Sequence, residues 1–146
     1  MITLYYNRMN ITASAFSRHR HIPSPSTCVK PPDTLARLVQ ECHDYLNGKP
    51  VLVFHFIPDI SHYSVFRQAV LRIVHKIPYG STMTYGDIAK HAGYPGAARA
   101  VGTTVKQNPW AVLIPCHRVV AANGIGGYNS GLDNKRALFM LENISL

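Results

Sequence analysis

Long hydrophobic runs are missing from this sequence of 146 residues, although 47% of the residues are hydrophobic. No run reaches the roughly 20 residues that a membrane-spanning helix needs, so we expect no membrane partner. The N-terminus lacks the charged-then-apolar order of a secretory signal, and no repeat of solenoid length is present. The sequence therefore predicts a globular protein of one or two small domains.

Cysteine is also scarce, and the three present are Cys28, Cys42 and Cys116. An odd number in a small protein argues against a disulfide framework and for reduced thiols. We therefore expect a cytoplasmic protein, or a nuclear one if the source is eukaryotic. His19 and His21 lie near Cys28, but no paired Cys-x-x-Cys frame supports a metal site, so we predict no metal.

Acidic residues are few, with seven Asp and Glu against 15 Lys and Arg, and the formal net charge is +8. The excess is uneven: residues 1–60 carry six basic against four acidic residues, and residues 61–146 carry nine against three. The second half is therefore the predicted seat of a polyanionic partner. An excess of charge that serves only solubility is the alternative.

The first part of the chain alternates extended and helical patterns. Residues 2–6 are β-branched and aromatic, as expected of a strand, and residues 51–57 show the same character. Residues 33–46 predict a helix whose apolar stripe is Leu35, Leu38, Val39, Cys42 and Leu46. The connection after residue 57 marks the predicted boundary between a domain of residues 1–59 and a domain of residues 60–146.

The second part reads as a series of helices. An apolar stripe predicts a helix over residues 65–77, and Thr84 with Asp87 resembles a capping box that begins a helix ending near residue 92. A tight turn then leads to a helix over residues 97–107. Helix, tight turn and helix is the helix-turn-helix plan, although two ordinary packed helices would give the same pattern. A last helix is expected over residues 133–142.

The helix predicted over residues 97–107 has an unusual composition. Its inward face carries Ala98, Val101 and Val105, and the other side carries Arg99, Ala100, Thr103 and Lys106. Small residues on that outer side let the helix axis approach another surface closely. That arrangement suits a narrow groove better than the long side chains of a major-groove reader.

A cysteine, a histidine and an arginine follow one another after an apolar run at residues 111–114. The run predicts a short buried, strand-like segment. Pro115 restricts the backbone conformation immediately before Cys116. Cys116 becomes a nucleophile as a thiolate, which a base such as His117 favours. The alternative for this pair is a buried cysteine beside a surface histidine and Arg118.

Several motifs together decide between these alternatives. They occur in a fixed order between about Tyr45 and Glu142: Ile77-Pro78-Tyr79-Gly80, Thr84-Tyr85-Gly86, Ala97-Ala98-Arg99-Ala100-Val101-Gly102, Asn108-Pro109, Ile114 to Val120 with its Pro-Cys-His-Arg-Val core, Gly127-Tyr128 and Leu141-Glu142. In this order and spacing the chain resembles the O6-alkylguanine-DNA alkyltransferases, also called methylated-DNA–protein-cysteine methyltransferases.

The resemblance implies a fold and a function. The fold is α+β: a small N-terminal sheet-plus-helix domain, then a mostly helical domain with a winged-helix-like helix-turn-helix. The function is DNA repair by irreversible transfer of an alkyl group from O6-alkylguanine, and from O4-alkylthymine, to Cys116, with base flipping and a single turnover. The partner is damaged double-stranded DNA, the protein is a monomer, and no cofactor is needed.

The resemblance also assigns roles to single residues. The catalytic set is Cys116 as nucleophile, His117 as its base through a water molecule, Glu142 as the acid that holds the imidazole, Tyr85 as a donor to guanine N3, and Asn108 as the anchor of the active-site turn. The DNA-binding set is Arg99, which replaces the flipped base, with Ala100, Thr103, Lys106 and Arg118. Arg118 is also expected to anchor the active-site turn. The substrate-pocket set is Val105, Tyr128, Ser130 and Lys135.

Two alternatives stay open. A binding module that keeps the fold would lack the cysteine, which Cys116 argues against, and a helix-turn-helix regulator without chemistry would not need the Pro-Cys-His-Arg run. If His117 and Glu142 activate Cys116, we also expect the pKa of its thiol to lie below the free value of roughly 8.5.

Overall fold

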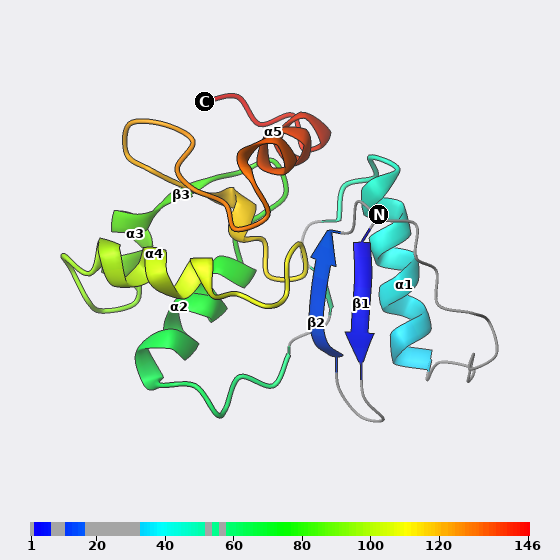
Figure 1. Cartoon of the computed structure of the whole chain (residues 1–146), viewed down its shortest axis with the longest axis horizontal. Helices are drawn as coiled ribbons and strands as arrows, with labels where there is room; N and C mark the ends of the chain where they lie inside the picture. Colours follow the sequence, from blue (N-terminus) through cyan, green and yellow to red (C-terminus); the bar gives the residue numbers. More distant parts are fainter. Residues whose placement is uncertain (1, 7–10, 17–32, 52–53, 56–57) are drawn as a thin grey trace.

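The computed structural model describes residues 2–6, 11–16, 33–51, 54–55 and 58–146 (Figure 1). Within these residues the chain is α+β. In order, the elements are β1 (Ile2–Tyr6), β2 (Ile11–Phe16), α1 (Asp33–Leu46), α2 (Val65–His75), β3 (Met83–Thr84), α3 (Tyr85–His91), α4 (Ala98–Lys106), the 3₁₀ turn η2 (Cys116–Arg118), β4 (Val119–Val120) and α5 (Leu132–Leu141).

The N-terminal elements are a hairpin and a helix. Strands β1 and β2 pair antiparallel, with Ile2 opposite Phe16 and an irregularity between Tyr5 and Tyr6. Figure 1 shows this hairpin and α1 on one side of the molecule and the remaining helices on the other. The predicted strand at residues 2–6 and the predicted helix at residues 33–46 are confirmed.

The predicted strand at residues 51–57 and the considered metal ligands have other outcomes. Residues 51, 54 and 55 of the predicted strand at 51–57 have no strand conformation, and the rest of that segment lies outside the described residues. His19, His21 and Cys28, considered as metal ligands, lie outside them as well.

Helix α1 buries a narrower stripe than its sequence suggests. Leu38, Cys42 and Tyr45 are buried, at the spacing of one helix face, whereas Val39 and Leu46 are exposed. Tyr45, which the predicted stripe omitted, is fully buried. This face joins α1 to the core that it shares with the C-terminal helices.

The C-terminal core is built where α2, α3 and α4 pack against one another. Val70 and Val74 of α2, Ile88 of α3 and Val101 of α4 are completely buried. The predicted inward face of α4 is confirmed for Val101 and Val105. In the part of the chain described here, no helix combines the length and apolar character that crossing a membrane demands.

The predicted capping box at the start of α3 is confirmed. The Thr84 hydroxyl accepts a hydrogen bond from the Asp87 amide at 3.1 Å and donates to the Asp87 carboxylate at 2.6 Å. Gly93 adopts a positive φ of 83° just past the end of α3, which a side chain would disfavour. A three-residue turn then leads to α4.

A short parallel pair joins this cap to the segment that carries the cysteine. Met83 lies opposite Val119 and Thr84 opposite Val120. The start of α3, with Tyr85, is therefore held beside the end of η2. Residues that are 36 positions apart in the sequence thus lie side by side.

We predict that Thr84→Ala destabilises the protein by about 1 kcal/mol, because the first turn of α3 loses its capping oxygen. Thermal unfolding should show a melting temperature lower by a few degrees. Thr84→Ser keeps the oxygen and serves as the control, which should melt close to the wild type. Equal melting of Thr84→Ala and wild type would contradict the role of the cap.

Candidate active site

The segment before Cys116 is a turn, so the predicted strand at residues 111–114 is wrong. Asn108 donates through its amide to the Ile114 carbonyl at 2.9 Å and accepts from the Trp110 amide at 3.1 Å. Val112 has a φ of 72°, which is strained for a β-branched residue. Side-chain hydrogen bonds from Asn108, rather than sheet pairing, therefore shape the turn, as its predicted anchoring role requires.

Cys116 begins η2 with 6% of its surface exposed. Burial raises the pKa of its thiol, and the Asn108 amide and the Lys135 charge lower it only in part. The expectation of a depressed thiol pKa is therefore wrong for the protein alone. Desolvation of the anion outweighs the favourable neighbours, so the resting group is a thiol.

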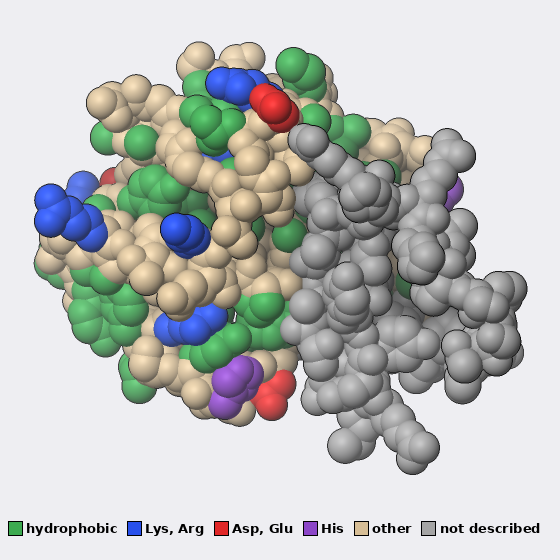
Figure 2. Space-filling model, viewed as in Figure 1, with side chains coloured by type: hydrophobic (Ala, Val, Ile, Leu, Met, Phe, Trp, Pro, Cys, Tyr) green, Lys and Arg blue, Asp and Glu red, His purple; other side chains and the backbone are tan. Residues whose placement is uncertain are grey.

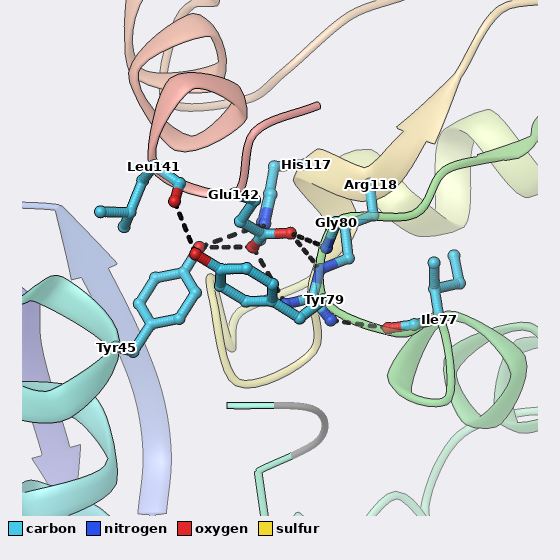
Figure 3. A network of polar contacts seen from close by, with 8 residues as sticks. All are labelled: Tyr45, Ile77, Tyr79, Gly80, His117, Arg118, Leu141 and Glu142. Carbon is cyan, nitrogen blue, oxygen red and sulfur yellow. Dashed lines mark hydrogen bonds and ion pairs between the residues drawn. The ribbon is translucent and has the colours of Figure 1, made fainter. Parts of the chain in front are cut away.

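A buried network centres on Glu142, which is 2% exposed (Figure 3). Its Oε1 accepts from the Tyr45 hydroxyl at 2.6 Å, from His117 Nε2 at 2.7 Å and from Arg118 Nη2 at 2.9 Å. Its Oε2 accepts from Arg118 Nε at 2.9 Å and from the Gly80 amide at 3.1 Å. Glu142 is thus an interior anchor rather than a solvated helix end.

This network fixes the charge of Glu142. Burial alone would raise the pKa of its carboxyl, but the hydrogen bonds from His117 and Arg118 lower that pKa to about 2. The carboxylate is therefore ionised at neutral pH and can only accept hydrogen bonds.

The ionised carboxylate selects the tautomer of His117. Because Glu142 can only accept, Nε2 of the imidazole carries the hydrogen that bridges the two groups. Burial lowers the pKa of His117, which favours the neutral ring, so Nδ1 holds a lone pair. Nδ1 makes no hydrogen bond within the described residues. The site therefore presents a buried base with a free acceptor next to Cys116.

Arg118 was predicted to contact DNA, and the structure corrects this. The residue is 1% exposed, and beyond its two bonds to Glu142 it donates through Nη1 to the Ile77 carbonyl at 2.6 Å. A guanidinium that is enclosed in this way cannot reach a phosphate. Its role is to neutralise the buried carboxylate and to join η2 to the end of α2.

A cavity of about 400 Å³ lies between α3, α4 and the loop before α5. Its lining residues are Tyr85, Gly102, Val105, Lys106, Gly127, Tyr128 and Asn129. Tyr85, Val105 and Tyr128 are thus brought together as predicted. Asn129 lines the cavity, and the predicted Ser130 is not among its lining residues.

Tyr85 and Tyr128 both line the cavity. The ring of Tyr85 packs closely against Gly126. A Cβ added at Gly126 would lie 3.2 Å from the Tyr85 hydroxyl oxygen and 3.1 Å from the Ala121 nitrogen. The Tyr128 hydroxyl is buried without a hydrogen bond in the described part of the chain. Such a group is available to a ligand.

Lys135 is not a lining residue of the cavity. Its side chain instead binds the loop before α5 that borders the cavity. Its fully buried ammonium donates to the Val119 carbonyl at 2.6 Å and to the Gly127 carbonyl at 3.2 Å. Burial lowers the pKa of Lys135 to about 8, and Cys116 opposes that shift. The ammonium is the positive charge that favours a thiolate at Cys116.

The outer face of α4 is exposed as predicted. Arg99, Ala100, Thr103 and Lys106 all reach solvent. Figure 2 shows that blue basic side chains outnumber red acidic ones on the helical part of the visible face. Among the described residues, no three His, Cys, Asp or Glu side chains cluster as metal ligands would.

Comparison with known proteins decides the family. The model of the family described as "6-O-methylguanine DNA methyltransferase, DNA binding domain" matches residues 65–144, which contain the cysteine turn, α4 and Glu142. The chain belongs to the 6-O-methylguanine DNA methyltransferase family.

Relatives in this methyltransferase family cover the chain to different extents. A methylated-DNA–protein-cysteine methyltransferase of Mycolicibacterium paratuberculosis is 41% identical over 121 residues, which are 82% of this chain and 72% of that protein. One from Methanosarcina acetivorans is 53% identical over 78 residues, which are 53% of this chain and 50% of that protein. The chain therefore spans about half the length of some of the relatives it matches.

A solved member of the methyltransferase family shares the fold over nearly the whole chain. The crystal structure of Mycobacterium tuberculosis OGT in complex with DNA aligns with a TM-score of 0.78 and 35% identity. The alignment covers 97% of this chain and 85% of that one.

We predict that Glu142→Gln lowers the free energy of unfolding by about 3 kcal/mol at pH 7, since a shift of one pKa unit is worth about 1.4 kcal/mol. Because the folded-state pKa is depressed to about 2, this stabilisation is present above the unfolded pKa near 4.5 and is lost as pH falls toward 2. Chemical denaturation of both proteins at neutral and acidic pH checks this. A stability difference that does not shrink at acidic pH would contradict the assignment.

Proposed function

We propose that this protein repairs double-stranded DNA by transferring a methyl or larger alkyl group from guanine O6 to Sγ of its own Cys116. The observation that carries the proposal is that Cys116, His117 and Glu142 are all buried, that Nε2 of His117 is bound to Glu142 while its Nδ1 makes no hydrogen bond within the described residues, and that a 400 Å³ cavity lies nearby. A relative of the same family has been solved with DNA.

The reaction begins with the proton of the thiol. Nδ1 of His117 accepts it through a bridging water, and Glu142 and Lys135 stabilise the resulting charges on either side. Because burial raises the pKa of the Cys116 thiol, the thiolate forms in contact with substrate and is not the resting form of the free protein. This limits side reactions of an exposed nucleophile.

Transfer is then a substitution at the alkyl carbon. The Cys116 sulfur forms a bond to that carbon while the bond from the carbon to O6 breaks, and the electron pair stays on the guanine. Tyr85 donates to guanine N3 as charge develops, and the base regains one proton in exchange for the one lost by the thiol. The products are a thioether and unmodified guanine.

The thioether is stable, and no step of the proposed reaction removes the group from Cys116. Each molecule therefore acts once. O4-alkylthymine presents a similar alkyl–oxygen bond and is a second substrate of the proposal. The rest of the proposal is a monomeric, intracellular protein, nuclear in a eukaryote, divided into domains of residues 1–59 and 60–146.

We further propose that α3 and α4 act as a winged-helix-like helix-turn-helix, with α4 in the minor groove. Its outer residues Ala100 and Thr103 are small, which permits close approach, and Lys106 contacts phosphate. Arg99 fills the space of the target base, and that base enters the cavity lined by Tyr85, Val105, Tyr128 and Asn129. The Tyr128 hydroxyl supplies a hydrogen bond to the base.

We predict that mixing the protein with DNA that contains O6-methylguanine adds one methyl group per molecule. Peptide mass mapping should find it on Cys116 and not on Cys42, whose pKa burial raises to about 11. Cys116→Ala should bind the DNA and take up no methyl. Repeated turnover, or a label on another cysteine, would contradict the proposal.

We predict that Arg99→Ala slows repair of duplex DNA by at least tenfold but leaves the reaction with free O6-benzylguanine nearly unchanged. The reason is that unstacking costs a few kcal/mol only when the base starts inside a duplex. Single-turnover rates on both substrates test this. Lys106→Ala tests phosphate binding separately: it should weaken DNA binding and reduce the salt dependence of that binding. Equal losses on both substrates in Arg99→Ala would argue against flipping.

A further inference from the structure

Tyr45 connects the N-terminal helix to the candidate catalytic acid. It lies in α1, 97 positions before Glu142, and its hydroxyl donates to Glu142 Oε1 at 2.6 Å. The same hydroxyl lies 3.4 Å from His117 Nε2. Figure 3 shows the tyrosine approaching the carboxylate from α1, opposite the side on which Arg118 and Gly80 bind it.

The tyrosine ring is held where it is by packing. Tyr45 is fully buried, and its ring makes edge-to-face contacts with Phe54 at 5.7 Å and with Tyr79 at 6.1 Å between centroids. Leu38 and Cys42 continue the same buried face of α1. Because a buried hydroxyl needs a partner, this packing commits the Tyr45 hydroxyl to the carboxylate.

The contact has an unusual feature: Oε1 of Glu142 serves three donors. Tyr45, His117 and Arg118 all direct a hydrogen to it within 2.9 Å. A carboxylate oxygen offers about two lone-pair directions, so the three donors compete for it. A second donor on the same oxygen weakens the pull that the carboxylate exerts on the imidazole hydrogen.

We propose that Tyr45 is a positioning residue for alkyl transfer: by sharing Oε1 of Glu142 with His117, its hydroxyl fixes the carboxylate and keeps the imidazole neutral, so that Nδ1 can accept a proton. The role in alkyl transfer rests on the proposed function, whereas the contacts of Tyr45 with Glu142 and His117 do not depend on it. This role assigns a part of the N-terminal half of the chain to the chemistry of the C-terminal half.

The charge of His117 depends on every group that faces it. These groups are Cys116 and Arg118 on the same segment, Glu142 and Lys135 at the C-terminal end, and Tyr45 from α1. The side chains of Tyr79 and His75 instead bond to the Leu141 and Leu113 carbonyls. The positive charges of Arg118 and Lys135 lower the pKa of His117, and Glu142 raises it. His75 adds no charge at neutral pH, because burial lowers its pKa. Replacing Tyr45 by phenylalanine leaves all the other groups in place.

The sign of the effect follows from this competition. Without the Tyr45 hydroxyl, Oε1 interacts more strongly with His117, so the imidazole takes up a proton at higher pH. We predict that the acid midpoint of Cys116 alkylation by iodoacetamide, followed by peptide mass, moves up by roughly half a pH unit to one unit in Tyr45→Phe. The probe needs neither DNA nor an alkylated base.

Tyr79→Phe is the matched control. Its hydroxyl donates to the Leu141 carbonyl at 2.5 Å, next to Glu142 in sequence, but not to the carboxylate. It should lose comparable stability in a melting curve and keep the wild-type midpoint. An unchanged midpoint in folded Tyr45→Phe, or an equal shift in both variants, would overturn the inference. Failure of the wild type to accept a methyl group from DNA would overturn the proposed function and leave this comparison valid.

Discussion

The ionised carboxylate buried at Glu142 is the constraint on which the rest of the site depends. A lone charge inside a protein is costly, so the chain surrounds this one with Arg118, His117, Tyr45 and the Gly80 amide. These donors come from three places: α1, the segment that follows α2, and η2. The carboxylate belongs to Glu142, which follows α5. One ionised group therefore links elements that also share the hydrophobic core.

The same network reconciles burial with reactivity. Desolvation holds Cys116 as a thiol and His117 as a neutral base, and the ammonium of Lys135 lies where it stabilises a thiolate once one forms. A permanently ionised thiol would be exposed to oxidants and other electrophiles. A thiol that stays protonated in the resting protein avoids such reactions.

Local patterns predicted the elements well, and tertiary effects account for the misses. The cap at Thr84 and the outward face of α4 could be read from spacing, and the motif around Cys116 indicated the candidate residues His117 and Glu142, which the structure brings together. The turn at residues 111–114 was mistaken for a strand, because an apolar run gives no sign of the Asn108 side chain that shapes it. The burial of Arg118 depends on a carboxylate 24 positions away. Tyr45 could have been noticed from its spacing after Leu38 and Cys42, but its partner could not.

The claim that Glu142 holds His117 as a neutral base can be tested most directly by nitrogen NMR of isotope-labelled histidine, with His117 assigned through a His117→Gln variant. The account predicts, at neutral pH, a protonated Nε2 and an unprotonated Nδ1 in the free protein. An imidazolium with both nitrogens protonated, or the opposite tautomer, would contradict it.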